Sequence, residues 1–252
     1  MNCIQILGEM KNYKPFLFKQ FAIAQNNAAM KVGTDSVLLG SWATINPNER
    51  ALDIGTGTGL LSLMLAQKVD GNCIIDAVEV EEGAILDADS NIKHSKWQNS
   101  IKLHNKDFNE FKTDSLYDVI ITNPPFFEGL APENATRSIA RNASDKLSYK
   151  NLLERASKLL REGGRMYLIL PYEYFNKVIK LGLENNLQVR NQLALKPKND
   201  KPINRVLIEF IKDFEPEPRT QSKNHSTLIV RNAQNLYTTE HINLTKAYYL
   251  NF

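Results

Sequence analysis

The chain has 252 residues, enough for one substantial α/β domain with a short extension. Hydrophobic residues make up 42% and charged residues 23%, as in ordinary globular proteins, and no apolar run is long enough for a membrane span. The net charge of +3 is mildly basic, which permits nucleic-acid binding but does not establish it.

Cysteines and histidines are too few and too scattered to indicate a disulfide framework or a metal site. The two cysteines are Cys3 and Cys73, and the four histidines show no ligand spacing. The N-terminus lacks the basic and apolar regions of a signal peptide, so we expect a cytoplasmic protein. We expect no bound metal, no membrane association and no obligate protein partner.

The first 50 residues form an entry segment. Aromatic residues that alternate with polar ones predict a short hairpin or strand within an N-terminal extension, residues 1–30. The stretch 31–35 is typical of a loop, and Thr34 or Asp35 can cap a helix predicted over 36–43.

From residue 51 onward, predicted strands alternate with predicted helices. Short apolar runs indicate strands, and longer runs with apolar residues at helical spacing indicate helices. The predicted strands are 51–54, 73–80, 101–104, 117–122, 166–170, 187–195 and 203–211, with 225–230 as a further candidate. The predicted helices are 59–68, 82–94, 147–161 (closed by glycines 163 and 164) and 172–186.

This alternation predicts right-handed βαβ units and a mostly parallel sheet. The last strands are joined by short polar loops, which favours an antiparallel pair at the sheet edge. We therefore predict a Rossmann-like α/β fold with a seven-stranded, mostly parallel sheet, an antiparallel edge strand and helices on both faces. We expect a single domain over 1–252, in which 31–252 form the core behind the N-terminal extension.

A glycine-rich turn joins the first predicted strand of this alternation to its helix. It reads Asp53-Ile54-Gly55-Thr56-Gly57-Thr58-Gly59, and its glycines permit a tight turn and close approach of the backbone to a ligand. A dinucleotide site prefers G-x-G-x-x-G and a pyrophosphate, which Asp53 would repel. The acid suits a ligand with an ammonium group, such as the methionine part of S-adenosylmethionine.

Acidic residues follow the next two predicted strands. Glu79 can accept hydrogen bonds from both hydroxyls of a ribose, although it could also be a solvated acid at a strand end. Asp107 can accept a hydrogen bond from the amino group of an adenine, with Phe108 packed against the adenine ring. Alternatively, Asp107 could cap a helix or a turn. Together with the glycine turn, these residues predict an adenosyl cofactor across the carboxyl edge of the sheet.

The motif Asn123-Pro124-Pro125-Phe126 ends the strand 117–122, because proline has no N–H to donate. Asn123 Oδ1 and the Pro124 carbonyl can accept the two N–H bonds of a planar amine, and Phe126 can stack on its plane. These acceptors give the delocalised nitrogen more tetrahedral character and position it for reaction. The motif therefore predicts methyl transfer to a nitrogen of a planar amide or aromatic amine.

Two groups of basic residues accompany these motifs. Runs of this kind are most often solvated faces. One group is Lys196, Lys198, Lys201 and Arg205, and the other is Arg137, Arg141, Lys146 and Lys150. The second group overlaps a polar segment, 128–145, that is long for a simple connection and is either a functional or a solvated loop.

In all these motifs the chain resembles the class I S-adenosylmethionine-dependent methyltransferases, and more narrowly the bacterial tRNA1(Val) adenine-37 N6-methyltransferases. The resemblance covers nearly the whole chain and is most specific in Ala29-Met30-Lys31-Val32-Gly33-Thr34-Asp35. It extends to the segments 16–21, 36–43, 60–67, 75–79 and 244–250. It implies that Asn123, Pro124 and Phe126 hold a target adenine and that Arg137 and Arg141 contact tRNA phosphates. The cofactor residues that it implies are Lys31, Gly33, Asp53, Gly55, Thr56, Gly57, Glu79, Asp107 and Phe108.

The implied reaction is N6-methylation of adenine 37 in tRNA1(Val), with S-adenosylmethionine as cofactor, S-adenosylhomocysteine as product and tRNA as partner. Phe126 stands where that family commonly has tyrosine, and phenylalanine there also occurs in ribosomal RNA guanine-N2 methyltransferases. The alternative is therefore another enzyme with this motif, acting on ribosomal RNA guanine or on a protein glutamine. A non-catalytic RNA-binding module that keeps the fold is the alternative from a different class.

Overall fold

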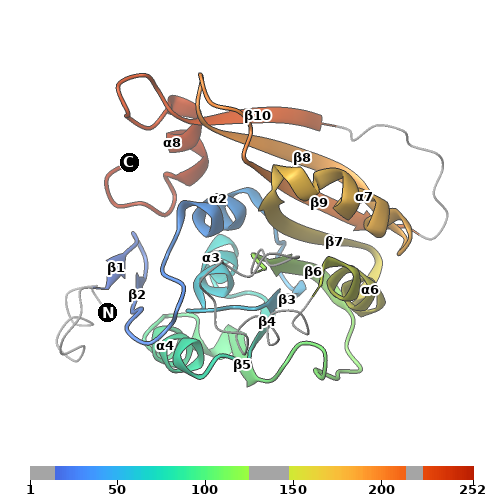
Figure 1. Ribbon diagram of the computed structural model, residues 1–252. Helices are drawn as coiled ribbons and strands as arrows, with labels where there is room; N and C mark the ends of the chain where they lie inside the picture. The colour runs from blue at the N-terminus through green and yellow to red at the C-terminus, as the bar shows by residue number, and fades with distance from the viewer. Residues whose placement is uncertain (1–14, 125–147, 214–223) are drawn as a thin grey trace, which may run out of the picture.

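The computed structural model describes residues 15–124, 148–213 and 224–252 (Figure 1). Its centre is an eight-stranded sheet in the order β10-β8-β9-β7-β6-β3-β4-β5. The strands are β3 (Arg50–Ile54), β4 (Ile74–Glu79), β5 (Ile101–Asn105), β6 (Tyr117–Thr122), β7 (Leu160–Pro171), β8 (Leu187–Lys198), β9 (Arg205–Lys212) and β10 (Asn224–Arg231). All of them except β9 run in the same direction, which confirms the predicted Rossmann-like fold.

The strand count and the edge differ from the prediction. β10 is an eighth strand, and it pairs with β8 in parallel to form the edge of the sheet. The antiparallel strand is β9, which lies inside the sheet between β7 and β8. The β8–β9 connection is short enough for a hairpin, whereas the chain between β9 and β10 is long enough to cross the sheet and begin a parallel strand.

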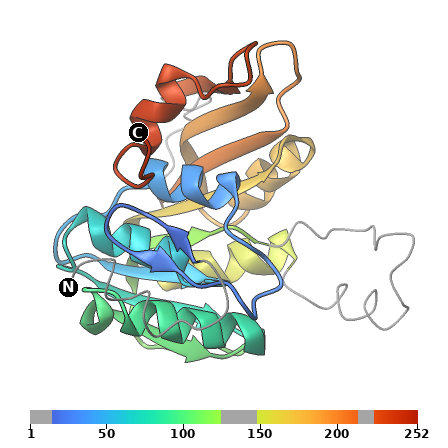
Figure 2. The same cartoon turned by 90° about the vertical axis from the view of Figure 1, so that its left-hand side faces the viewer.

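Helices cover both faces of the sheet, as predicted (Figures 1 and 2). One face is covered by α2 (Thr34–Trp42), α3 (Leu60–Lys68) and α4 (Glu82–Lys93), which share a core cluster with β3 and β4. On the other face, α6 (Tyr149–Leu159) and α7 (Phe175–Leu183) share a second cluster with β6 and β7. None of the helices within the described ranges is long and apolar enough to cross a membrane.

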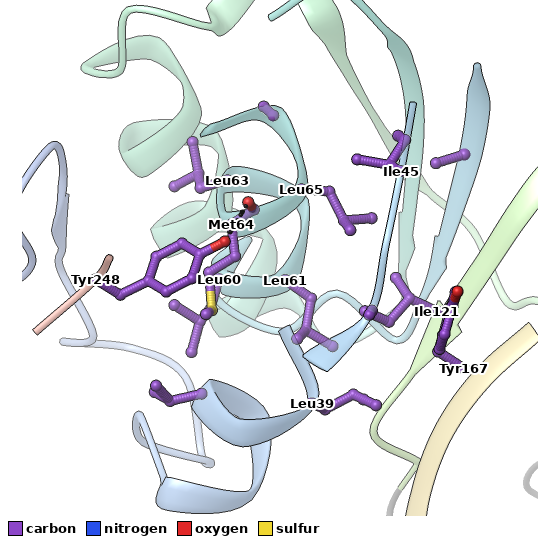
Figure 3. Packing of buried hydrophobic residues seen from close by; sticks show 14 of the residues in the cluster. Leu39, Ile45, Leu60, Leu61, Leu63, Met64, Leu65, Ile121, Tyr167 and Tyr248 are labelled. Atoms are coloured by element: carbon purple, nitrogen blue, oxygen red, sulfur yellow. Dashed lines mark hydrogen bonds between the residues drawn. The ribbon is translucent and has the colours of Figure 1, made fainter. Parts of the chain in front are cut away.

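The N-terminal hairpin that the sequence predicts is β1 (Phe16–Leu17) paired with β2 (Ala22–Ile23). It lies beside the C-terminal segment, where Phe18 pairs with Tyr249. That segment includes a helix that the sequence did not predict, α8 (Thr239–Thr245). Figure 3 shows Tyr248 reaching α3, where its hydroxyl donates to the Met64 carbonyl at 3.0 Å. The hairpin and the C-terminal segment therefore lie together against the same face of the core.

Three predicted boundaries were wrong. The glycines 163 and 164 do not close a helix but lie within β7, where the pairing with β6 shifts register. The stretch 172–186 divides into a 3-10 turn, η2 (Tyr172–Tyr174), and α7. Gly33 occupies the N-cap position of α2 without a side-chain cap bond, so neither Thr34 nor Asp35 caps that helix. The remaining short turn, η1 (Gln98–Ser100), precedes β5.

A buried carboxylate, Asp76 of β4, ties β3, β5 and β6 together. It accepts from Arg50 at 2.5 Å, from His104 at 2.7 Å and from the Tyr117 hydroxyl at 3.0 Å. Burial alone would raise the pKa of Asp76, but these hydrogen bonds outweigh it and hold the pKa below the ordinary value. The stability that Asp76 contributes is thus present above its ordinary pKa and is lost on acidification through the lower folded pKa.

Asp76→Ala is expected to lower the free energy of unfolding by about 3–5 kcal/mol, because it leaves the partners of a buried ion pair without their acceptor. Urea denaturation at neutral pH measures this loss. Asp70→Asn removes an exposed charge that pairs with Lys96, keeps a side chain that tolerates the positive φ at this position, and should change stability far less. Equal effects of the two substitutions would contradict a structural role of the Asp76 network.

Candidate functional site

The carboxyl ends of β4, β3 and β6 meet at the centre of the sheet, where open α/β sheets bind ligands. A cavity of about 280 Å³ lies on the β4 side of this edge, and another of about 400 Å³ lies on the α2 side. Both are lined by Met30, Gly55, Gly57 and Asn123. The two cavities are therefore adjoining lobes of one site, with Asn123 at their junction.

The first lobe has the dimensions and lining expected of an adenosyl pocket. Its walls include Glu79 and Val80 at the end of β4, and Asp107 and Phe108 after β5. The second lobe is lined by residues 31–36 and by the glycine turn. Eight of the nine residues that the sequence predicts around the cofactor border one or both lobes. The ninth, Asp53, lies buried beneath the turn.

The glycine turn needs glycine because of its backbone conformation. Gly55, Gly57 and Gly59 have φ values of 68°, 57° and 82°, in the left-handed region that favours glycine. A Cβ at Gly55 or Gly57 would meet nothing within 4 Å. The turn therefore presents bare backbone to the cavity on both sides of Thr56.

Asp53 is completely buried beneath the turn, and its two oxygens differ. Oδ2 accepts from the Thr56 hydroxyl at 2.6 Å and from the Ser62 hydroxyl at 2.7 Å and amide at 3.0 Å. Oδ1 has no partner among the described residues. Burial, with a smaller contribution from the charge of Glu79, raises the pKa of Asp53 to about 6, despite the hydrogen bonds from Thr56 and Ser62.

Glu79 is held by backbone amides on both oxygens. Oε2 accepts from Gly57 at 2.9 Å, and Oε1 accepts from Val80 at 2.8 Å and Glu81 at 2.9 Å. A carboxylate has about four acceptor positions and three are occupied here, so Oε2 can still accept from a ligand hydroxyl. These bonds explain how the end of β4 is fixed against the glycine turn.

Asp107 and Phe108, which lie just beyond the end of β5, contribute both to the local fold and to the wall of the first lobe. Asp107 Oδ1 accepts from the Asn109 amide at 2.7 Å, which is the turn cap that the sequence left as an alternative. Phe108 is 5% exposed, and the Arg155 guanidinium lies 5.2 Å from its ring centroid on the core side. Both nevertheless border the first lobe, so neither role excludes contact with a cofactor.

Lys31 and Gly33 lie where α2 begins. The Lys31 ammonium donates to the backbone carbonyls of Gln25 at 2.5 Å and Ala28 at 3.0 Å. Its charge thus stabilises the preceding segment, while the residue itself lines the second lobe. Gly33 also lines this lobe as the N-cap of α2.

Asn123 is fixed by a residue that the sequence did not single out. Its Nδ2 donates to the Ser36 hydroxyl at 2.8 Å, which leaves Oδ1 buried and without a partner among the described residues. Pro124 is buried directly behind it. The predicted residues Phe126, Arg137 and Arg141 lie outside the described residues. No pattern near Ser36 could have revealed this contact, because the two residues are 87 positions apart.

Two further polar residues, on α4, hold the wall of the first lobe. Asp87 accepts from the backbone of Asn27 at 2.9 Å and of Ala28 at 2.8 Å. Asn91 exchanges hydrogen bonds with the backbone of Ala24 at 2.7 and 2.8 Å. The sequence could have indicated these residues by their spacing, because two polar residues four positions apart lie on the same helix face. On α4 that face is buried.

Asp87→Ala is expected to weaken cofactor binding about tenfold, because it releases the segment that closes the first lobe. Asp89→Ala is the matched control, since Asp89 lies on the same helix but pairs only with the exposed Lys93 among described residues. Calorimetric titration with S-adenosylmethionine measures both variants. Equal affinities would contradict a role of Asp87 in forming the pocket.

No group of three or more potential metal-binding side chains occurs in 15–124, 148–213 or 224–252. Two buried acceptors at this site, Asp53 Oδ1 and Asn123 Oδ1, have no partner among the described residues and suit donors on an organic ligand. S-adenosylmethionine fits this arrangement, in which Asp53 lies beneath the glycine turn, Glu79 ends β4 and Asn123 follows β6. Fold and site thus define a class I S-adenosylmethionine-dependent methyltransferase.

The comparisons with known proteins agree with this class. Residues 28–194 match the methyltransferase small domain family. A solved structure of a predicted O-methyltransferase from Agrobacterium tumefaciens superimposes with a TM-score of 0.65, covering 87% of this chain and 100% of that one at 17% identity. That likeness concerns the fold alone.

Two relatives narrow the family. The tRNA1(Val) (adenine(37)-N6)-methyltransferase of Haemophilus influenzae strain Rd is 42% identical over 94% of this chain and 99% of its own. The protein of the same name from Proteus mirabilis is 37% identical over 93% of both. The chain therefore belongs to the tRNA1(Val) (adenine(37)-N6)-methyltransferase family.

Proposed function

We propose that this chain transfers a methyl group from S-adenosylmethionine to N6 of adenine 37 in tRNA1(Val), the nucleotide next to the anticodon, in the cytoplasm. Family membership supports the reaction and its substrate. The single structural observation that carries the chemistry is the free acceptor Asn123 Oδ1, which the Ser36 hydroxyl holds at the junction of two ligand-sized lobes.

The cofactor residues divide between the two lobes. Glu79 accepts from the ribose at its Oε2, and Asp107 and Phe108 bind the adenine in the first lobe. Asp53 Oδ1, beneath the bare backbone of residues 55–57, attracts the ammonium group of the methionine part. When bound there, S-adenosylmethionine supplies an already activated methyl group, so the protein needs no strong base.

Asn123 and Pro124 prepare the target nitrogen. The lone pair of an adenine amino group is delocalised into the ring, which makes the nitrogen a weak nucleophile. Accepting its two hydrogens at Asn123 Oδ1 and the Pro124 carbonyl draws them out of the ring plane and returns electron density to the nitrogen. The buried Oδ1 of Asn123 is shielded from water, and holding the nitrogen in line with the donor supplies much of the rate enhancement.

Two proposals concern residues outside the described ranges. We assign Phe126 as the platform on which the extruded base stacks, a contact worth about 1–3 kcal/mol against the cost of unstacking. We assign Arg137 and Arg141 to tRNA phosphates. We also propose that 31–252 form one catalytic domain behind the extension 1–30.

Incubation with labelled S-adenosylmethionine and separate pools of tRNA, ribosomal RNA and protein tests the proposed substrate. We expect label in tRNA alone, and nuclease digestion with mass spectrometry should yield N6-methyladenosine at position 37. Label in guanine of ribosomal RNA or in protein would instead identify one of the related N-methyltransferases. A protein without detectable cofactor binding would be a non-catalytic RNA-binding module.

A further inference from the structure

The hairpin between β8 and β9 projects beyond the carboxyl edge of the sheet. Arg205 pairs with both Leu195 of β8 and Pro171, the last residue of β7, so the residues between 195 and 205 extend past that edge. Because β8 runs parallel to β6, this is the edge that carries Asn123. In Figure 1 the ends of β8 and β10 point to the same side of the molecule as the end of β6.

Two cations lie on one face at the base of this hairpin. Lys196 and Lys198 alternate along β8, so their side chains leave the face opposite Leu195, which packs in the core. Lys201 adds an exposed cation at the hairpin tip. We name these three lysines the hairpin cluster. Arg231 of β10, the parallel partner of Lys198, is not part of it, because its guanidinium lies 4.0 Å from the Tyr237 ring centroid and donates to the Asn235 carbonyl at 2.7 Å.

The hairpin cluster has few compensating acids. Asp200 is the sole acidic residue within 196–205, and among the described residues no ion pair joins a carboxylate to Lys196, Lys198 or Lys201. Arg205 is excluded from the cluster because it pairs with Asp35 at 3.0 Å. The charge of the three lysines is therefore available to an anionic ligand.

An exposed aromatic ring lies between the hairpin cluster and Asn123. Tyr172 follows β7, the neighbour of β6, and is 42% exposed. Its amide donates to the Asn204 carbonyl at 3.1 Å, which fixes it to the base of the hairpin. Along the sheet edge, Asn123 is therefore followed by the Tyr172 ring and then by the hairpin cluster. Surfaces that bind single-stranded nucleic acid also combine aromatic rings, which stack on bases, with cations, which contact phosphates.

We propose that the hairpin cluster binds the phosphate backbone of the RNA substrate while the target base occupies the site at Asn123. This docking surface presupposes the RNA methylation proposed above. Lys196 and Lys198 contact the strand on one face of the sheet, and Lys201 contacts it from the tip. Phosphate contacts of this kind position the RNA without reading its sequence.

The double variant Lys196→Ser/Lys198→Ser tests the surface. With in vitro transcribed tRNA1(Val), we expect binding about tenfold weaker, with the slope of log K against log salt smaller by one to two. The loss should appear in KM for tRNA, and the affinity for S-adenosylmethionine should be unchanged. Lys93→Ser/Lys102→Ser is the matched control, because it removes the same charge from α4 and β5 and should leave tRNA binding unchanged.

The outcomes separate this surface from the proposed function. If the unaltered protein methylates tRNA but the hairpin variant matches it in affinity and salt slope, the docking surface is wrong and the function stands. If both double variants lose affinity equally, net charge rather than this surface is responsible, which also overturns it. If the unaltered protein does not methylate tRNA, the proposed function fails and the docking surface fails with it.

Discussion

Asn123→Ala is expected to bind S-adenosylmethionine as well as the unaltered protein does and to lose methyl transfer about 10²–10³-fold, the usual cost of removing one transition-state hydrogen-bond partner. Asn123 borders both lobes, but its buried Oδ1 is the atom that meets the target amine in our proposal. The loss should therefore fall on kcat at saturating cofactor and tRNA. Single-turnover methylation and calorimetry measure the two quantities separately.

Two further variants show how Asn123 acts. Asn123→Asp keeps an acceptor and should recover part of the rate, because the Ser36 hydroxyl can donate to a carboxylate. Ser36→Ala removes the partner of Nδ2 and should slow turnover without weakening cofactor binding. Normal turnover by Asn123→Ala, or a loss of its cofactor affinity equal to its loss of rate, would contradict the assigned role.

Asp53→Asn is expected to weaken cofactor binding at least tenfold while the protein without cofactor becomes no less stable. The buried charge is costly, as the pKa of about 6 shows, whereas an amide can accept the same hydrogen bonds from Thr56 and Ser62. The amide loses the charge that attracts an ammonium group. Thermal unfolding and calorimetric titration at pH 7.5 (roughly 1.5 units above that pKa) distinguish the two effects.

The pH dependence of the unaltered protein supplies a second test of Asp53. Its folded pKa lies above the ordinary value of 3.8, so between about pH 4 and 6 the folded state keeps a proton that the unfolded chain has lost. The contribution of Asp53 to stability therefore falls as the pH rises through this range and is constant above it. Affinity for S-adenosylmethionine should rise through pH 6 as Asp53 ionises, and Asp53→Asn should show neither dependence. Asp70→Asn is the exposed control and should retain both.

Much of the site was predictable because its residues follow parallel strands. The glycine turn, Glu79 and Asn123 each come directly after an apolar strand, and parallel strands end at one edge of the sheet. The chain order therefore brings together residues that are up to 70 positions apart. The strand count and the position of the antiparallel strand were not predictable, because they depend on where β10 pairs and not on any local pattern.

Other parts of the site depend on contacts between distant segments. Ser36 meets Asn123 across two elements, and Asp87 and Asn91 fasten the segment 24–28 to α4. A sequence pattern reports which face of an element is buried but not which element covers it. For the same reason, Lys196 and Lys198 look like a solvated face until the pairing of β8 with β9 places them at the sheet edge that carries Asn123.

The amino-acid sequence by itself determined the fold class, the cofactor-binding turn and the amine-binding motif, because each depends on a local backbone requirement or on the alternation of strands and helices. Only the tertiary structure decided which oxygen of Asn123 and of Asp53 is left for a ligand, since that depends on hydrogen bonds from other elements. It also decided that the basic hairpin lies at the reactive edge of the sheet, because the direction of β8 follows from its pairing with β9 and β10.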